Sequence, residues 1–340
     1  MAPIDTGQQY TVAAIIVNYC TPCLALECVE SLQGERDQIS NFQIYIVDNA
    51  SPDGSVAQIQ DAIDTRGWSE YVTLIENATN AGFSAGNNAA MRLILGSGVA
   101  PDYIYLVNPD AVALPGAAHH LAEYMSNHPS VAVAGGAILN SERQPQVAAR
   151  RFPTIWSELE SAARLRPLSR LLQKKLVSMP ISQTPHECDW VSGASMMIAT
   201  KAIRDIGLFD EGYFLYFEEV DLCHRVKNAG YSIHHVPTST IVHIEGASTN
   251  IKGRKRRGAY WYNSRRRYFL KTSGIIGLIA ADVMWGIGRL TLKARMLARL
   301  TRQHAESDPT HFAFDLLVGD LTAILSGRIF RERQGSGTRS

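Results

Sequence analysis

The fold of this chain is decided by residues 42–51, whose sequence is FQIYIVDNAS. The run Phe42–Val47 is short, apolar and rich in β-branched and aromatic side chains, which is typical of a buried strand. It stops at Asp48 and Asn49, and the turn signal Ser51-Pro52-Asp53-Gly54 follows. This order predicts a strand whose carboxyl end opens onto a ligand site.

The same pattern recurs along the chain. Apolar runs predict further strands at Val12–Val17, Tyr71–Ile75, Tyr103–Val107, Cys188–Ala199 and Tyr231–Val236. Helical patterns separate the early strands at Leu24–Leu32, Val56–Ile63, Asn87–Leu95 and Gly116–Met125, and a further helix starts near Phe217. Alternating strands and helices predict an α/β fold with a mostly parallel central sheet and helices on both faces.

The composition indicates a globular protein. The chain has 340 residues, of which 46% are hydrophobic, so it can bury a sizeable core. Residues 1–9 contain no apolar secretory segment, and five cysteines do not make an even disulfide framework. We therefore expect a reduced, cytoplasmic setting.

The net charge of +1 conceals a strong asymmetry. Residues 251–302 hold fourteen Lys and Arg and a single acid, Asp282, whereas the remainder holds nineteen basic and thirty-one acidic residues. Aromatic residues interleave the basic block Lys252–Lys271, and the amphipathic stretch Ile275–Leu300 follows. Together they predict a helix that lies on an anionic membrane surface.

Two alternatives remain for this basic region. It can be a pair of helices packed on the preceding α/β domain with a solvated basic face, or a nucleic-acid surface, although no recognised nucleic-acid motif accompanies it. The longest uncharged run has ten residues, below the ~20 needed to span a bilayer, so we expect no transmembrane helix here.

The strand ends carry acids and amides in place of the usual nucleotide motifs. Neither a GxxxxGK[ST] nor a GxGxxG after the first strand is present; the strands end instead at Asn18, Asp48 and Asn108-Pro109-Asp110. Asp110 suits a divalent cation that bridges a diphosphate, since Mg²⁺ or Mn²⁺ takes only one or two protein carboxylates. Asp48 can accept the imide N–H of a uracil or thymine ring. Alternatively, Asp48 and the segment Asn108-Pro109-Asp110 only shape turns, because Asn and Asp side chains hydrogen-bond to their own backbone.

Residues 80–88, NAGFSAGNN, lie between a predicted strand and a helix. The two glycines allow close backbone approach, and the amides can bind sugar or phosphate oxygens. Alternatively, this is a glycine-rich loop in which Asn caps the helix.

Three carboxylates, Glu218, Glu219 and Asp221, crowd the first turn of a predicted helix. Clustered carboxylates raise one another's pKa, so one of them is a candidate general base. Alternatively, they complement the helix dipole while Asp221 pairs with Arg225. We expect the upstream aromatic residues to help exclude water; these are Tyr213, Phe214, Tyr216 and Phe217.

A rival function rests on Cys20-Thr21-Pro22-Cys23. A CxxC between a strand and a helix is typical of thiol–disulfide redox proteins. This interpretation leaves the acidic strand ends unexplained.

Taken together, the segments resemble glycosyltransferase family 2, inverting enzymes with the GT-A fold, and most closely its bacterial rhamnosyltransferase branch. The resemblance covers about Val12 to Ser248 and rests on five motifs in the family's order. They are Asn18-Tyr19, Val47–Ser51, Asn80–Asn88, Asn108-Pro109-Asp110 and Gly207–Arg225, and His243 and Ser248 match the branch's His…Ser tail.

The resemblance implies roles for the remaining residues. Asp48 would hold the pyrimidine, Asn18, Asn80, Gly82, Phe83, Asn87 and Asn108 would line the nucleotide sugar, and Asp110 and His243 would bind Mg²⁺ or Mn²⁺. Trp190 and Gly193 would lie on the acceptor side. Glu219 stands where the family has its catalytic Asp, yet relatives carry Glu-Asp where this chain has Glu218-Glu219, so the choice among Glu218, Glu219 and Asp221 stays open.

The resemblance also implies the partners. The donor would be a dTDP- or UDP-sugar, with dTDP-L-rhamnose indicated by the branch, and the acceptor a lipid-linked or polysaccharide hydroxyl in cell-surface glycan synthesis. The enzyme would be peripheral at the inner face of the cytoplasmic membrane, and no nucleic-acid partner is expected. We expect a catalytic domain at residues 1–250, a basic helical region at 251–333 and a loose tail at 334–340.

Overall fold

The computed structural model describes residues 10–244, 256–298 and 308–327. The chain divides into two compact units, each built from separate segments. Unit 1 comprises Met1–Arg150, Pro180–Glu211 and Glu219–Thr249, and unit 2 comprises Arg151–Met179, Gly212–Glu218 and Asn250–Ser340. Ser248, residues 252–255 and the tail from residue 334, all invoked above, lie outside the described residues.

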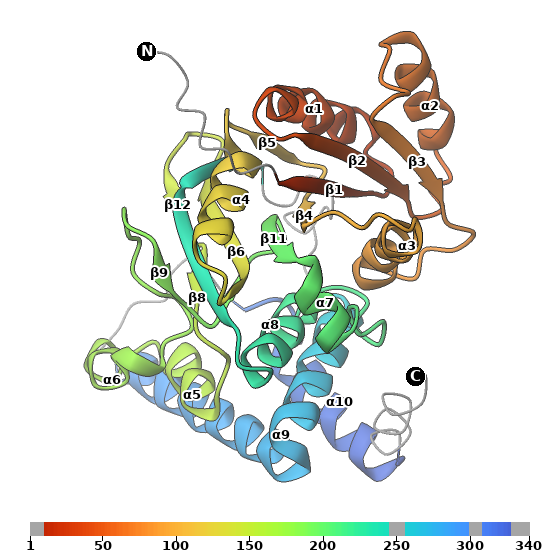
Figure 1. The fold of residues 1–340 in the computed structure, drawn as a ribbon. Helices are drawn as coiled ribbons and strands as arrows, with labels where there is room; N and C mark the ends of the chain where they lie inside the picture. Colours follow the sequence, from red (N-terminus) through yellow and green to blue (C-terminus); the bar gives the residue numbers. More distant parts are fainter. Residues whose placement is uncertain (1–9, 245–255, 299–307, 328–340) are drawn as a thin grey trace. The chain divides into compact units, whose positions relative to one another are not determined.

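Unit 1 is an α/β structure around one ten-stranded sheet, as the sequence predicts (Figure 1). The strands of its main path follow the order β3-β2-β1-β4-β11-β6-β12-β5. They are β1 (Thr11–Asn18), β2 (Asn41–Asp48), β3 (Val72–Glu76), β4 (Tyr103–Val107), β5 (Ala111–Ala113), β6 (Val131–Leu139), β11 (Ser195–Ala199) and β12 (Ser232–His243). Off this path, short strand β7 (Pro145–Gln146) pairs with β6 and β9 (His186–Glu187) pairs with β12, and β8 (Ala149–Arg150) pairs with β10 (Trp190–Val191) separately.

The parallel half of the sheet positions the strand ends. β3, β2, β1 and β4 are parallel, whereas β11 runs antiparallel between β4 and β6. The chain moves one way from β1 through β2 to β3 and then crosses back to β4, so right-handed connections place α1 and α3 on opposite faces. In register, Asn18 faces Asp48 across the β1–β2 pair, which brings both polar ends to one edge.

The helices of unit 1 follow the predicted alternation. They are α1 (Pro22–Leu32), α2 (Ser55–Thr65), α3 (Phe83–Gly96), α4 (Ala117–Asn127), α7 (Thr200–Ile206) and α8, which begins at the boundary residue Glu218 and ends at Asn228. A 3₁₀ turn covers Gln33–Asp37.

Three predicted elements have different bounds in the structure. The strand expected at Cys188–Ala199 is broken into β10 and β11, because the chain turns at Gly193. β12 continues past Val236 to His243 through a register shift, so its final residue is His243. Helix α3 begins at Phe83 because Gly82, with φ of 93°, ends the preceding loop.

Unit 2 is helical. Its elements are α5 (Ile155–Ala163), α6 (Arg166–Leu171), a 3₁₀ turn at Gln173–Lys175, α9 (Ala259–Leu297) and α10 (Phe312–Leu325). α5 begins with a capping box in which Thr154 and Ser157 exchange hydrogen bonds. α9 is interrupted at Gly274, whose backbone (φ 66°, ψ −171°) is not helical.

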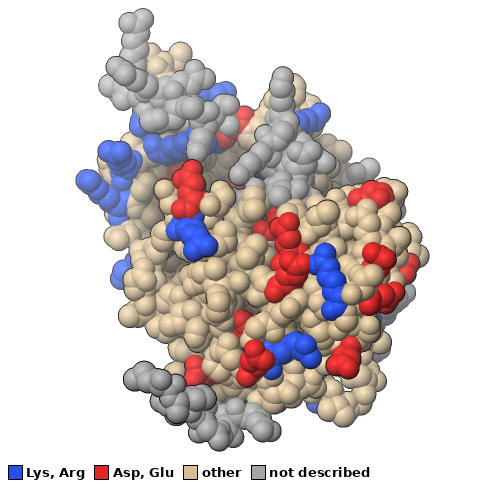
Figure 2. Space-filling view, turned by 90° about the horizontal axis from the view of Figure 1, so that it is seen from above, with Lys and Arg blue, Asp and Glu red and all other residues tan. Residues whose placement is uncertain are grey.

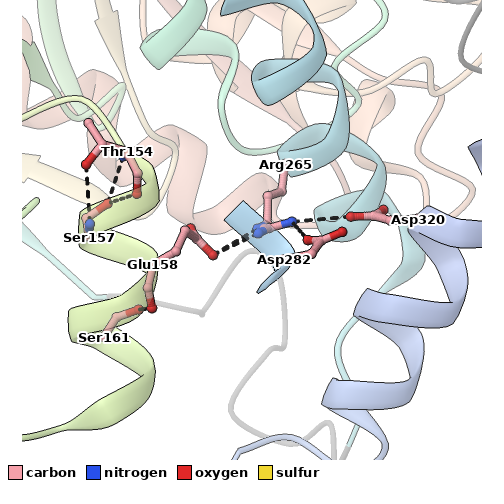
Figure 3. A network of polar contacts seen from close by, with 7 residues as sticks. All are labelled: Thr154, Ser157, Glu158, Ser161, Arg265, Asp282 and Asp320. Carbon is pink, nitrogen blue, oxygen red and sulfur yellow. Dashed lines mark hydrogen bonds and ion pairs between the residues drawn. The ribbon is translucent and has the colours of Figure 1, made fainter. Parts of the chain in front are cut away.

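Unit 2 encloses a buried ionic network that includes part of the basic block (Figure 3). Arg265, 1% exposed, donates to Glu158 and Asp282 at 2.9 Å each and to Asp320 at 3.3 Å. Arg266 donates to the same Asp320 at 2.6 Å. These two arginines lie inside the unit, so they do not belong to the surface that the sequence predicts.

The length of the apolar stretch in helix α9 differs from the prediction that the C-terminal segment is too short to span a membrane. It contains an eighteen-residue window of mean hydropathy 1.6, so by length and composition alone it can cross a bilayer. The prediction counted only uninterrupted uncharged residues, whereas this window tolerates up to two charged ones. A helix in the core of a soluble protein passes the same test, although only 22% of this window is buried.

The outer surface carries charges of both signs. On the face in Figure 2, acidic and basic side chains form small separate groups among uncharged residues. Other cations of the basic region also have partners in unit 2: Arg256 pairs with Asp315, Arg289 pairs with Asp308, and Arg295 donates to the carbonyls of Ala163 and Arg164.

Candidate active site

The ends of β1 and β2 are joined by a buried pair of side chains. Asn18 donates from Nδ2 to Asp48 Oδ2 at 2.7 Å, and both residues are fully buried. Asp48 Oδ1 accepts the backbone N–H of Ser51 at 2.8 Å, which is the Asx-type turn considered above. Asn18 Oδ1 accepts the backbone N–H of Thr21. Both carboxylate oxygens of Asp48 are therefore engaged within unit 1, and its contact with a base stays a prediction.

The residues predicted to bind a metal lie together. His243 ends β12, and β12 pairs with β5 so that His243 stands opposite Ala111, next to Asp110. The Nε2 atom of His243 lies 3.1 Å from Asp110 Oδ1 and 3.2 Å from Asn108 Nδ2. Asp110 is 3% exposed.

The donor chemistry of this pair fits a divalent cation. As placed, the single Nε2 atom faces both a donor amide and an acceptor carboxylate, and neither tautomer of the ring satisfies both neighbours. A cation between the imidazole lone pair and the carboxylate would remove that conflict. Within the described residues, no group of three or more His, Cys, Asp or Glu side chains could hold a metal ion, so this is a two-ligand set with room for phosphate and water.

In the loop at residues 80–88 the N-cap of α3 is Gly82, so no Asn side chain caps the helix, and binding of the donor by this loop stays a prediction. Asn80 Oδ1 accepts the Gly82 backbone N–H at 3.0 Å and so shapes the turn into α3. The backbone at Gly86 lies close to the sheet and not to an open ligand site. A Cβ at this position would come within 2.8 Å of Val17 and 3.0 Å of Asn49. Asn87 donates to the Phe83 carbonyl, while its buried Oδ1 accepts no hydrogen bond from any described residue.

Of the acceptor-side residues, Trp190 lies in β10, which pairs antiparallel with β8, and Gly193 lies in the turn after β10. Trp190 pairs with Arg150, whose guanidinium lies 5.1 Å from the centre of the indole ring. Gly193 turns the chain between β10 and β11, and a Cβ there would lie 3.4 Å from the Phe83 ring. The predicted donor and acceptor segments therefore meet at Phe83 and Gly193.

Glu219 differs from Asp221 in its surroundings. Its half-buried carboxylate accepts a hydrogen bond from the Gly193 backbone and lies near Arg150. Burial raises the pKa of Glu219, and Gly193 and the positive Arg150 oppose that rise. Its Oε2 atom is buried and has no hydrogen-bond partner among the described residues. A carboxylate with a raised pKa and an unused oxygen is typical of a general base.

Asp221, by contrast, has a structural partner. It accepts a hydrogen bond from Arg225 Nε at 3.0 Å. Arg225 also donates to the carbonyls of Ile206 and Leu208, at 2.7 and 2.9 Å, and so ties α8 to the loop that follows α7. The geometry therefore favours Glu219 over Asp221 as the base.

Glu218 is buried and belongs to unit 2 with the preceding residues. The aromatic residues expected to exclude water from the site pack instead within unit 2. Phe214 and Tyr216 contact Tyr260, and Phe217 contacts Trp261 and Tyr268. Tyr216 and Phe217 both have φ near 70°, a strained conformation for aromatic residues, which these ring contacts hold in place.

The cysteines do not show the chemistry of a redox pair. Cys20 and Cys23 are exposed free thiols. Burial and the negative charge of Asp53 raise the pKa of Cys20, whereas reactive CxxC thiols need a lowered pKa.

Comparison with known families decides the class. The family model "Glycosyl transferase family 2" matches residues 13–184, just over half of the chain. The chain belongs to this family. The model "Glycosyl transferase family group 2" also matches, over residues 103–325. The protein is thus a glycosyltransferase, as its motifs predict, and the redox alternative has no support.

Relatives of this glycosyltransferase confirm the fold and the branch that it resembles. The N-acetylglucosaminyl-diphospho-decaprenol L-rhamnosyltransferase of Mycobacterium tuberculosis is 24% identical over 281 residues, which cover 75% of this chain and 83% of the relative. A mannosyltransferase from Pyrobaculum calidifontis, solved with GDP-mannose and Mn²⁺, superposes with a TM-score of 0.55 at 15% identity and covers 93% of this chain and 81% of its own. GalNAc-T7, solved with UDP, GalNAc and Mn²⁺, gives 0.57 at 14% identity, with 93% and 58% covered. The GT-A fold is confirmed.

Two neighbours of the site were not predicted. Arg150 lies beside Glu219, and no pattern in the sequence connects residues so far apart. Asn88 exchanges two hydrogen bonds with the backbone of Phe209, at 2.9 and 3.0 Å, and so joins α3 to the segment before α8. The sequence does place Asn88 in a predicted donor loop, but its partners are the Phe209 backbone and the Glu211 carboxylate.

Proposed function

We propose that this glycosyltransferase inverts the anomeric configuration while it moves a sugar from a nucleoside diphosphate onto a hydroxyl of a lipid-linked acceptor. The observation that carries this proposal is Glu219, whose buried Oε2 has no described partner and whose pKa is raised. Asp110 and His243, in the same unit, supply a site for the diphosphate's counter-cation.

In the proposed reaction, Glu219 Oε2 takes the proton of the acceptor hydroxyl as the oxygen attacks the anomeric carbon. The bond from that carbon to the diphosphate oxygen breaks, and the nucleoside diphosphate leaves with the electron pair. A single displacement of this kind inverts the configuration. When bound by Asp110 and His243, a divalent cation would supply charge neutralisation to the leaving diphosphate.

The proposed donor is dTDP-L-rhamnose. Support comes from the mycobacterial relative, whose name specifies rhamnosyl transfer to a diphospho-decaprenol-linked sugar. The same relative supports a lipid-linked acceptor over a soluble one. We further propose that the enzyme works as a peripheral protein at the inner face of the cytoplasmic membrane, where such an acceptor would be reached.

The proposed cation is Mn²⁺ or Mg²⁺, and the imidazole of His243 favours Mn²⁺, because Mg²⁺ prefers oxygen ligands throughout. Both solved structures described above contain Mn²⁺.

Thermal unfolding with a nucleotide panel tests donor and metal together. With Mn²⁺ present, we expect dTDP or UDP to raise the melting temperature more than GDP, CDP or NAD. Asp110→Ala should abolish the metal-dependent part of the shift while the variant alone melts normally. A full shift in Asp110→Ala would exclude Asp110 as a ligand, and no shift with any nucleotide would contradict the proposed function.

A further inference from the structure

The second half of α9, after the break at Gly274, has an unusual outer face. Its buried side consists of Leu278, Ala281, Trp285 and Gly288, which follow helical spacing. The opposite side exposes an aliphatic row, from Ile276 (80% exposed) to Leu297 (85% exposed). The row consists of Ile276, Ile279, Val283, Ile287, Leu290 and Leu297.

Helix α10 also exposes apolar side chains. Its buried residues include Asp320, which has no exposed surface because it binds Arg265 and Arg266. Its outer side exposes Phe314, Leu317, Val318, Leu321 and Leu325, of which Leu325 is 78% exposed. The outer side of a helix on the surface of a soluble protein is normally charged or polar, so the outer sides of α9 and α10 are exceptional.

On α9 and α10, therefore, the network of Arg265, Arg266 and Asp320 lies in the interior while aliphatic side chains lie outside; exposed Lys and Arg occur elsewhere in unit 2. We call the eleven exposed residues of α9 and α10 the aliphatic faces. Exposed apolar surface of this extent marks an interaction site. We propose that the aliphatic faces insert among the acyl chains of a lipid bilayer and hold the enzyme there. This deepens the membrane placement proposed above, and it assigns the attachment to hydrophobic burial instead of the basic block.

The composition of the aliphatic faces favours lipid over a second protein. The cores of protein interfaces are enriched in Tyr, Trp and Arg and include regular hydrogen bonds. Ten of the eleven side chains here are Ile, Leu or Val, one is Phe, and none can form a hydrogen bond. Leu, Ile, Val and Phe are the residues that transfer most favourably into a bilayer.

The charges of α9 agree with this placement. Lys271 and Lys293 are exposed near the two ends of the α9 row, where long side chains can reach the headgroups. Within the row, Asp282 and Arg289 point to partners in unit 2, namely Arg265 and Asp308. The hydrocarbon region would therefore meet no unpaired charge from these two residues.

Vesicle flotation of the full chain tests the proposal. We expect co-flotation with neutral phosphatidylcholine vesicles to persist at about 1 M NaCl, where surface electrostatics are screened. The triple variant Ile279→Glu, Val283→Glu, Ile287→Glu should lower vesicle partitioning by about 100-fold or more, since three exposed aliphatic groups are lost. The matched control, Leu93→Glu with Val99→Glu, changes exposed apolar residues of unit 1 and should float like the wild type.

Two further measurements separate the other outcomes. A triple Ser variant at the same positions removes the apolar groups without adding charge, and circular dichroism checks that it folds. Binding that requires anionic lipid and disappears with salt would assign attachment to the basic block and overturn the proposal. So would a wild-type dimer that becomes monomeric in the triple variant while neither floats. The nucleotide-induced shift in melting temperature does not depend on vesicle binding. A protein that shows this shift but does not float would therefore contradict the membrane proposal and leave the proposed transfer reaction standing.

Discussion

The two units of this glycosyltransferase differ in where their buried charged residues lie and in what their helices expose. Unit 1 has an apolar sheet, and buried acids lie where the strands end, at Asp48 and Asp110, while Glu219 lies in the first turn of α8. Unit 2 encloses its ions around Arg265 and exposes aliphatic side chains on α9 and α10.

The difference indicates two kinds of surroundings. Polar groups at strand ends suit a water-soluble donor that approaches the edge of a sheet. Buried ions beneath an aliphatic exterior suit a medium that cannot solvate charge. Substitutions in each unit can therefore test whether the two units differ in this way.

The largest effect is expected at the proposed base. Glu219→Gln keeps the size of the side chain and can accept the Gly193 hydrogen bond, but cannot take a proton, so kcat should fall by about 10²–10⁴-fold. The measurement is the initial rate of nucleoside diphosphate release. If Asp221→Asn lost the same activity and Glu219→Gln lost none, the base would be Asp221.

The same variant has a predicted effect on stability. Because burial raises the pKa of Glu219 in the folded state, the folded protein binds this proton more tightly than the unfolded chain does. The stability from Glu219 is therefore fully present at low pH and is lost as the pH rises through the raised folded pKa. Glu219→Gln should accordingly melt at a higher temperature than the wild type at alkaline pH, whereas Asp221→Asn should melt lower.

An effect of a few kcal/mol is expected in the ionic network of unit 2. Asp320→Ala leaves Arg266 without its carboxylate and Arg265 with one fewer, which should lower the free energy of unfolding by about 3–5 kcal/mol. The control Asp315→Ala removes a pair with the largely exposed Arg256 and should cost about 1 kcal/mol or less. Urea unfolding measures the free energy of unfolding of both variants. An equal decrease in the two would show that the buried network stabilises unit 2 no more than an exposed ion pair does.

The smallest effect is expected at Arg150, which we infer to be a positioning residue. Its positive charge opposes the rise in the pKa of Glu219. Because the base acts when deprotonated, Arg150→Met should move the acid limb of the pH–kcat profile upward by about 1 unit. Arg150→Lys should restore the limb, and Arg204→Met, at an exposed position of α7, should leave it unchanged. An unmoved limb in Arg150→Met would exclude this electrostatic role.

Much of unit 1 follows from local sequence alone. The strands at Phe42–Val47 and Tyr103–Val107 are evident because β-branched runs bounded by turns favour buried strands. The polar residues after them are then fixed at one edge, because parallel strands share the direction of their carboxyl ends. The five ordered motifs also identify the family before any coordinate is considered.

Tertiary structure decided how the charges are partnered. The i, i+4 spacing of Asp221 and Arg225 is visible in sequence, but the contacts of Glu219 with Gly193 and Arg150 exist only once β8, β10 and α8 are assembled. The basic region likewise suggests an exposed cationic surface, because sequence shows charge and not burial. Arg265 lies inside unit 2 because Glu158 and Asp320, 107 and 55 residues away, fold against it. Side-chain period and turn chemistry are local and can be predicted, whereas burial and pairing of charges depend on distant segments meeting.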